Sequence, residues 1–246
     1  MRPLLTVLLL ALALACHPEY KAQREAALQS LVAMVSEVQE GREPEPLPYD
    51  LSRYGRHAGF LTFVHPRLVK VVALEREVQP LIRASMAWMD PHSWTSPAEI
   101  TRCRTEADRL LGILAANEAL QEETFGAAGQ REIDALEVPA VSREAFRKGL
   151  QEAYARNALL REFESLYRDR TRAQREVLAF LEGHLERMDE LRPIFPSVEE
   201  AQTYRQRVGE EKRAMARVQE KLASVAAAVR ELRSRQRDLV ESMKER

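Results

Sequence analysis

The chain has 246 residues, of which 45% are hydrophobic and 30% are charged, and its 37 basic and 38 acidic residues leave a formal net charge of −1. That apolar share can form a packed core, which excludes wholesale disorder. The balanced charge offers no basic field for nucleic acid, so that class of partner is excluded. Glycine is rare, at 9 residues, and helix-forming residue types dominate, so the composition favours helices.

Residues 1–15 have the pattern of an export signal. Arg2 gives a positive start, and residues 4–14 are uncharged and mostly Leu, Val and Ala. A helix that spans a bilayer needs about 20 apolar residues, and this run is shorter. We therefore expect cleavage after Ala15, which leaves a soluble body outside the cytoplasm.

The stretch "LALALACHPE" (10–19) resembles the lipobox of bacterial lipoproteins. Ala15 and Cys16 fit that motif, while Ala13 stands where Leu is usual. The resemblance implies that Cys16 carries a diacylglycerol on its sulfur and a third acyl chain, such as palmitate, on its amine. Two or three chains anchor a protein firmly, whereas one does not. Because His17 is not Asp, the resemblance also implies the outer membrane, facing the periplasm.

The alternative is a plain secreted or periplasmic protein. Ala13-Leu14-Ala15 also fits ordinary signal peptidase, and both patterns select the same bond. Cys16 would then be an ordinary thiol that could pair with Cys103, the other of the two cysteines. In the lipoprotein interpretation, which we favour, Cys103 is a lone helical thiol.

The first half of the mature chain predicts helices separated by proline-rich breaks. Residues 17–40 are helical in pattern, and "EGREPEPLPYD" (40–50) ends that helix. A second helical region covers 51–88, with a break expected near His65 because the residue before a proline avoids helical geometry. A third helix begins after a loop, with Ser96 as its cap and a glutamate three residues later, and runs to about Phe125. "GAAGQ" ends it, and residues 131–141 are expected to be a connector.

The second half predicts two long helices, from Ser142 to about Leu191 and from Val198 to the C terminus, with a Ser197–Glu200 capping box between them. Apolar residues recur at heptad spacing in both helices, which indicates coiled-coil packing. An antiparallel hairpin folded at Phe195 would set Leu160 near Val229, although the same seams could serve an intermolecular coiled coil. A polar layer would lie in mid-hairpin, formed by Thr171, Gln174 and Glu211.

The predicted fold class is all-α, a helical bundle with a long antiparallel C-terminal hairpin. No strand pattern is convincing. We divide the chain into a signal peptide (1–15), a lipidated N terminus with the first helix and the proline-rich connector (16–50), a bundle region (51–141) and the hairpin (142–246).

Catalytic, metal and cofactor motifs are not found in the sequence. The 5 histidines form no His-Glu-x-x-His pair, and Gly-rich phosphate loops, Gly-x-Ser-x-Gly and Cys-x-x-Cys are missing. We therefore predict no enzyme, no metal site and no cofactor. The best candidate for a contact surface is the loop "MAWMDPHSW" (86–94), where Trp88, Trp94 and Met89 could bind a partner or could plug the end of the bundle; the plug is favoured.

Two stretches, "IFPSVEEAQTYRQRV" (194–208) and "VQPLIRA" (78–84), resemble an uncharacterised family of helical lipoproteins of Gram-negative bacteria. The resemblance implies an envelope lipoprotein without known catalytic residues. We accordingly expect a structural or adaptor role, in which helical surfaces bind a protein partner in the envelope. The alternative is a periplasmic module that binds a small ligand or lipid within the bundle. The oligomeric state is left open.

Overall fold

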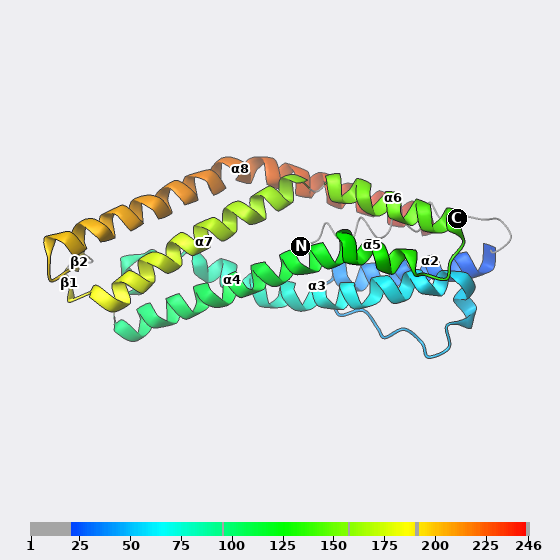
Figure 1. The fold of residues 1–246 in the computed structure, drawn as a ribbon, viewed down its shortest axis with the longest axis horizontal. Coiled ribbons are helices and arrows are strands. Elements are labelled where there is room, and N and C mark those ends of the chain that lie inside the picture. Colours follow the sequence, from blue (N-terminus) through cyan, green and yellow to red (C-terminus); the bar gives the residue numbers. More distant parts are fainter. Residues whose placement is uncertain (1–20, 95, 157, 190–191, 245–246) are drawn as a thin grey trace. The chain divides into compact units, whose positions relative to one another are not determined.

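A computed structural model describes residues 21–94, 96–156, 158–189 and 192–244. The described residues are mostly helical, with connecting loops and one small pair of strands, which confirms the all-α prediction (Figure 1). In chain order the elements are α2 (Lys21–Gln39), η2 (Ser52–His57), α3 (Ala58–Ser85), η3 (Pro91–Ser93), α4 (Pro97–Phe125), α5 (Ala127–Asp134), α6 (Ala140–Arg156), α7 (Ala158–His184), β1 (Arg187–Asp189), β2 (Arg192–Ile194) and α8 (Val198–Lys244).

The described residues form two compact units that each combine distant parts of the sequence. Unit 1 takes in 21–76, 116–158 and 228–244, and unit 2 takes in 77–115 and 159–227. The helices α3, α4 and α8 therefore supply residues to both units. The boundaries that the sequence suggested near residues 50 and 141 both fall inside unit 1.

The core of unit 1 forms between α2 and α3, with α6 beside them. Apolar residues of α2 and α3 recur every three or four positions, so each helix buries one continuous stripe. Phe146 of α6 enters this core, and its ring centroid lies 4.7 Å from that of Phe60 and 5.6 Å from that of Phe63. Buried residues of this core include Leu31, Val35, Val38, Phe60, Phe63, Val64, Leu68, Val71, Ile133 and Phe146.

The two helices run parallel, with an extended return between them. The hydroxyl of Tyr54, just before α3, donates to Ser30 Oγ of α2 at 3.3 Å. At the other end Arg76 Nη2 of α3 donates to the carbonyl of Gly41, just after α2, at 3.1 Å. The segment 42–50 must therefore carry the chain back along the helix pair, as the loop beyond α2 does in Figure 1.

The expected break near His65 is wrong, because α3 continues through both Pro66 and Pro80. A proline in a helix removes one N–H and crowds the preceding turn, so carbonyls there need other donors. Pro66 leaves the carbonyl of Thr62 without its usual donor. Arg67 Nη1 donates to the next carbonyl, that of Phe63, at 2.6 Å. Buried apolar side chains on both sides of Pro66 hold the helix against the core.

The start and end of α4 agree with the prediction. The amide of Glu99 donates to Ser96 Oγ at 3.4 Å, which caps the helix, and α4 ends at Phe125. The expected connector after it is instead a short helix, α5. A side chain at Gly129 would lie 2.2 Å from the carbonyl oxygen of Thr124, so only glycine allows this close approach of α5 to the end of α4.

The expected helix from Ser142 to Leu191 is two helices. α6 begins at Ala140, where the amide of Arg143 donates to the carbonyl of Pro139 at 2.9 Å, and Ser142 lies buried inside the helix instead of capping it. α7 ends at His184. Strands β1 and β2 follow as an antiparallel ribbon that pairs Asp189 with Arg192, a feature that the sequence pattern did not indicate.

The α7–α8 hairpin within unit 2 is confirmed, with a different register. Glu176 pairs with Arg207 at 2.9 Å, and Glu162 pairs with Lys221 at 2.8 Å. The predicted register, Leu160 beside Val229, is therefore wrong by more than one helical turn. The reason is that the chain reverses in the β ribbon and not at Phe195.

The capping box at the start of α8 is confirmed. The amide of Ser197 donates to Glu200 Oε2 at 3.1 Å, and the amide of Glu200 donates to Ser197 Oγ at 3.1 Å. The two bonds are reciprocal, as the Ser-x-x-Glu spacing requires.

Candidate functional site

The predicted lipidation site, Cys16, lies outside the described residues, and its modification stays a prediction. The first described helix, α2, begins at Lys21, only a few residues further along the chain. Cys103 is buried in α4 as a free thiol, and burial raises the pKa of this thiol. Its side chain is therefore a small apolar packing group in unit 2.

The tryptophan loop fills unit 2 from within. Trp88 and Trp94 are each 2% exposed. Trp88 Nε1 donates to Glu106 Oε2 at 3.0 Å, and Trp94 Nε1 donates to the carbonyl of Trp88 at 2.9 Å. Both rings are buried and both N–H groups are satisfied, which is what a stable plug requires.

The partner-binding prediction for this loop therefore needs correction at the two indoles. A partner cannot touch rings that are already covered by their own unit. Met89 is half-buried, and Met86, beside it in the chain, is 64% exposed. The only part of the predicted contact set that a partner could reach without rearrangement is thus the partly open Met89.

A buried polar cluster lies where α7, α8 and the end of α3 meet in unit 2. We call it the Arg170 cluster: Ser85, Tyr167, Arg170, Gln174 and Glu211. Arg170 Nη2 and Gln174 Nε2 donate to the carbonyl of Ser85 at 3.3 and 3.1 Å. The hydroxyls of Ser85 and Tyr167 lie 2.6 Å apart, and Arg170 Nε lies 3.7 Å from Glu211 Oε1.

The Arg170 cluster joins three helices at the carbonyl end of α3. The last carbonyls of a helix lack partners within it, and the side chains of α7 supply donors to one of them. Burial raises the pKa of Glu211, although the charge of Arg170 acts in the opposite direction. The cluster thus holds the C-terminal end of α3 against α7 and α8.

The sequence indicated part of this cluster. Gln174 and Glu211 belong to the predicted polar layer, which is confirmed as buried in mid-hairpin with its neighbour Thr171. Ser85 at the end of α3 contacts this layer through its carbonyl, which accepts from Arg170 and Gln174. The contributions of Ser85 and Arg170 were missed. A charged residue one turn from a heptad seam looks like a surface residue until the third helix is placed.

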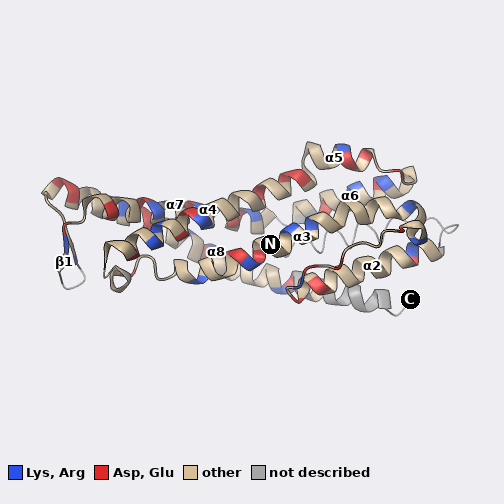
Figure 2. Ribbon diagram, turned by 90° about the horizontal axis from the view of Figure 1, so that it is seen from below, with Lys and Arg blue, Asp and Glu red and all other residues tan. Residues whose placement is uncertain are grey.

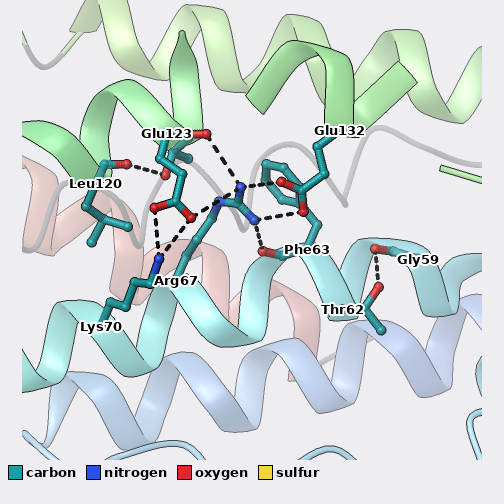
Figure 3. A network of polar contacts seen from close by, with 9 residues as sticks. Gly59, Thr62, Phe63, Arg67, Lys70, Leu120, Glu123 and Glu132 are labelled. Carbon is teal, nitrogen blue, oxygen red and sulfur yellow. Dashed lines mark hydrogen bonds and ion pairs between the residues drawn. The ribbon is translucent and has the colours of Figure 1, made fainter. Parts of the chain in front are cut away.

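A second arginine network ties α3 to α4 and α5 in unit 1 (Figure 3). Arg67, which is 2% exposed, donates through Nη2 to Glu132 Oε2 at 2.7 Å and through Nη1 to Glu132 Oε1 at 3.2 Å. Its Nη2 also lies 3.5 Å from the carbonyl of Glu123. Lys70 donates to both carboxylate oxygens of Glu123 at 2.8 and 2.9 Å. The guanidinium carbon lies 3.7 Å from the centroid of the Phe63 ring.

The Arg67 network has an inner and an outer side. The guanidinium is buried, while the Glu123 and Glu132 side chains are 44% and 47% exposed. Water can therefore keep hydrating the carboxylates while they bind the arginine. This arrangement holds three helices together.

The described histidines occupy separate structural positions. His57 is buried in unit 1, and burial together with the charge of Arg24 lowers its pKa. His65 Nε2 donates to the carbonyl of Glu45 at 2.9 Å, and the His184 ring stacks on Phe180 with centroids 4.2 Å apart. Across the described parts of the chain, no group of three or more His, Cys, Asp or Glu side chains is placed to hold a metal ion.

Charges of both signs alternate along the helices, as Figure 2 shows for the ribbon. Many of them form ion pairs between neighbouring helices, such as Arg175 with Asp108 at 3.0 Å and Arg109 with Glu77 at 2.9 Å. Among the helices of residues 21–94, 96–156, 158–189 and 192–244, none combines the length and apolarity that crossing a bilayer requires.

Comparison with known proteins gives no relative. No protein-family model, no curated protein and no solved structure matches the chain. The resemblance to helical envelope lipoproteins in residues 78–84 and 194–208 thus stays a prediction from the sequence.

Proposed function

We propose that the mature chain is a lipid-tethered helical protein of a bacterial cell envelope, facing the periplasm from the outer membrane. The observation that carries this proposal is "LALALAC" (10–16), an uncharged run that ends in Ala15 and Cys16. Acylation of Cys16 would fix the chain to a bilayer a few residues before α2 begins. Unit 1, which contains α2, would then lie close to the membrane surface.

We assign the protein a structural or adaptor role at that surface. Its buried charged groups support this role, because Arg67 and Arg170 both bind groups on helices other than their own. Such contacts between helices make a scaffold stiffer, and they use the buried polar groups to hold helices together. The exposed surface mixes charges with isolated apolar side chains such as Val141 and Leu222.

Detergent-phase partitioning of the full chain, produced in a Gram-negative host, tests the tether. We expect the wild type and a Cys103→Ser control in the detergent phase and a Cys16→Ser variant in the aqueous phase. Cys103 is the matched control because it is the other cysteine and is buried in the fold. A Cys16→Ser variant that still enters the detergent phase, or a wild type that stays out of it, would contradict the proposal.

Cross-linking in intact cells, followed by purification from solubilised membranes, tests the adaptor role. We expect one defined envelope protein to accompany the wild type and to be depleted with the Cys16→Ser variant, because the tether raises the local concentration of the two proteins. Recovery of the chain alone from both strains would remove the support for an adaptor.

A further inference from the structure

The proline-rich segment after α2 is not a loose linker. Residues 43–50, "EPEPLPYD", which we call the proline ridge, contain Pro44, Pro46 and Pro48 and form neither helix nor strand. Proline has a fixed φ and no N–H, so this sequence favours an extended chain over a helix or a central strand.

Contacts along its length fix the ridge to unit 1. The amide of Glu45 donates to Glu37 Oε2 of α2 at 3.1 Å, and the carbonyl of Glu45 accepts from His65 of α3 at 2.9 Å. Asp50 Oδ1 accepts from the amide of Ser52 at 2.8 Å, which closes the far end. The ridge is thus bound to both helices in its first half and to η2 at its end.

The length of α3 is compatible with an extended ridge. The chain must return from the level of Arg76, which binds Gly41, to the start of α3 at Ala58. At 1.5 Å per helical residue this is about 27 Å. About ten residues in polyproline geometry cover about 31 Å, whereas the same number in a helix covers about 15 Å. The remaining residues before Ala58 lie in η2 (Ser52–His57), so an extended ridge fits this distance without being stretched.

Two residues of the ridge that lie three positions apart, Pro44 and Leu47, are the ones turned toward unit 1, a spacing that matches one turn of a polyproline helix. Pro44 is buried, and Leu47 packs against the core of unit 1. Between and beyond them, the dipeptides Glu45-Pro46 and Pro48-Tyr49 are exposed, and Tyr49 has an exposed fraction of 107%. The outer face of the ridge therefore presents two successive dipeptides that contain proline, and it ends in an unburied aromatic ring.

We propose that the proline ridge is a docking site for a protein domain whose groove is lined by aromatic side chains, as in the recognition of polyproline ligands. One pocket would take Glu45-Pro46 and the next Pro48-Tyr49. Glu43, Glu45 and Asp50 along the ridge call for basic residues at the rim of that groove. Because the ridge is already extended and bound to unit 1, binding would order few further bonds, which favours affinity.

This inference rests on the proposed function in one respect, that the protein has a protein partner. It does not depend on the lipid at Cys16. It names an extended surface as the contact, in place of the helical surfaces that the sequence suggested.

Site-specific photocross-linking in cells that produce the full chain identifies what touches the ridge. A benzophenone amino acid replaces Tyr49, and the control carries it at Val141, which is also exposed, apolar and in unit 1. We expect an adduct with one protein from position 49 and not from position 141. The cross-linked peptide of that protein should map to a groove lined by aromatic residues. No adduct at position 49, equal adducts at both positions, or a cross-link outside such a groove would overturn the proposal.

Binding of the purified cross-linked protein to the intact chain tests whether the ridge itself is recognised. We expect Tyr49→Ala, and Pro46→Ala combined with Pro48→Ala, each to weaken binding at least about tenfold, while Val141→Ala leaves it unchanged. A synthetic peptide of residues 43–50 should compete with the intact chain, and unchanged thermal unfolding should show that the variants fold. Variants that bind as tightly as the wild type would overturn the proposal.

The two proposals fail in different ways. Loss of the tether alone would leave the purified complex intact, whereas loss of ridge binding alone would leave the chain in the detergent phase. A Cys16→Ser chain that keeps its affinity for the cross-linked protein in solution would support the ridge on its own.

Discussion

Each unit contains a buried arginine that binds neighbouring helices. The two arginines differ in how exposed the carboxylate is that pairs with them. In unit 1, Arg67 binds Glu132 at 2.7 Å, and that carboxylate is 47% exposed. In unit 2, Arg170 lies 3.7 Å from Glu211, and that carboxylate is only 8% exposed. One arginine thus has a hydrated counter-ion and the other a desolvated one.

This difference decides what each network contributes. A carboxylate that stays in water loses little solvation on pairing, so the Arg67 pair carries the desolvation cost of one ion, the guanidinium. Taking both charges out of water costs several kcal/mol per ion, and the attraction between Arg170 and Glu211 must first offset this. The Arg170 cluster is therefore expected to specify geometry, while the Arg67 network mainly stabilises.

The largest effect is expected when Glu211 is removed. Glu211→Ala leaves the charge of Arg170 buried without a counter-ion, which should lower the free energy of unfolding by about 3–5 kcal/mol. Denaturant unfolding measures this change. Replacing both residues, with Arg170→Met and Glu211→Leu, should restore most of the stability. If the double variant is as unstable as the single one, the pair contributes more than it costs and the comparison fails.

The pH dependence of the free energy of unfolding tests the same Arg170–Glu211 pair in a second way. Since burial raises the pKa of Glu211 above the usual 4.5, protonation is easier in the folded state than in the unfolded chain. The stability due to this group is then fully present below pH 4.5 and declines as the pH rises through the raised pKa. Unfolding measured between pH 7 and 4.5 should show this trend as a difference between the wild type and the double variant. Parallel curves for the two proteins would contradict it.

A smaller effect is expected at Glu132. Glu132→Ala removes two hydrogen bonds to Arg67. Glu123 Oε1 remains 4.0 Å from Arg67 Nη2, and water can enter the space that the partly exposed Glu132 side chain leaves. We expect a loss of about 1.5–3 kcal/mol in denaturant unfolding, less than for Glu211→Ala. A loss equal to or larger than that for Glu211→Ala would show that exposure of the carboxylate does not set the cost.

His57 is a buried group in unit 1 that can lose its charge, unlike either arginine. Burial, with the charge of Arg24, lowers its pKa from 6.5, so the folded state prefers the neutral ring. The stability due to His57 is present above about pH 6.5 and is lost as the pH falls through the lowered pKa. His57→Gln should therefore flatten the fall in thermal stability between pH 7 and 5. A variant that loses stability as steeply as the wild type would contradict this assignment.

The smallest effect is expected at Lys70, on the outer side of the Arg67 network. Lys70 and Glu123 are 52% and 44% exposed, and exposed ion pairs are worth little. Lys70→Ala should change the free energy of unfolding by at most about 0.5 kcal/mol, and added salt should remove even that difference. A loss above about 1 kcal/mol would mean that Lys70 positions Glu123 for Arg67.

Local patterns in the sequence predicted the helices well and their junctions poorly. The caps at Ser96 and Ser197 follow from short-range hydrogen bonding, so they could be found without the fold. The break expected at His65 was wrong, because α3 packs buried side chains on both sides of Pro66, Phe63 and Val64 before it and Leu68 after it, and no local rule places that core. The hairpin register was missed because the β ribbon moves the turn away from Phe195.

Candidate sites can be proposed from the sequence where one motif carries the chemistry, and not where they depend on tertiary packing. Cys16 and its apolar run are legible in the sequence alone. Trp88 binds Glu106 of α4 and Trp94 binds the carbonyl of Trp88, both in the interior of unit 2. Leu47 packs against the core of unit 1, while Tyr49, two residues on, is exposed. Neither placement could be deduced from residue type, since aromatic side chains serve both as plugs and as contact residues.

The central claim is that the chain is anchored through Cys16, and the mass of the mature N-terminal peptide tests it most directly. The chain is purified from membranes of a Gram-negative host, digested, and its N-terminal peptide is measured by mass spectrometry. The account predicts a peptide that begins at Cys16 and carries a thioether-linked diacylglycerol and an amide-linked acyl chain. A peptide that begins at Cys16 with a free thiol and a free amine, or with Cys16 in a disulfide to Cys103, would contradict it.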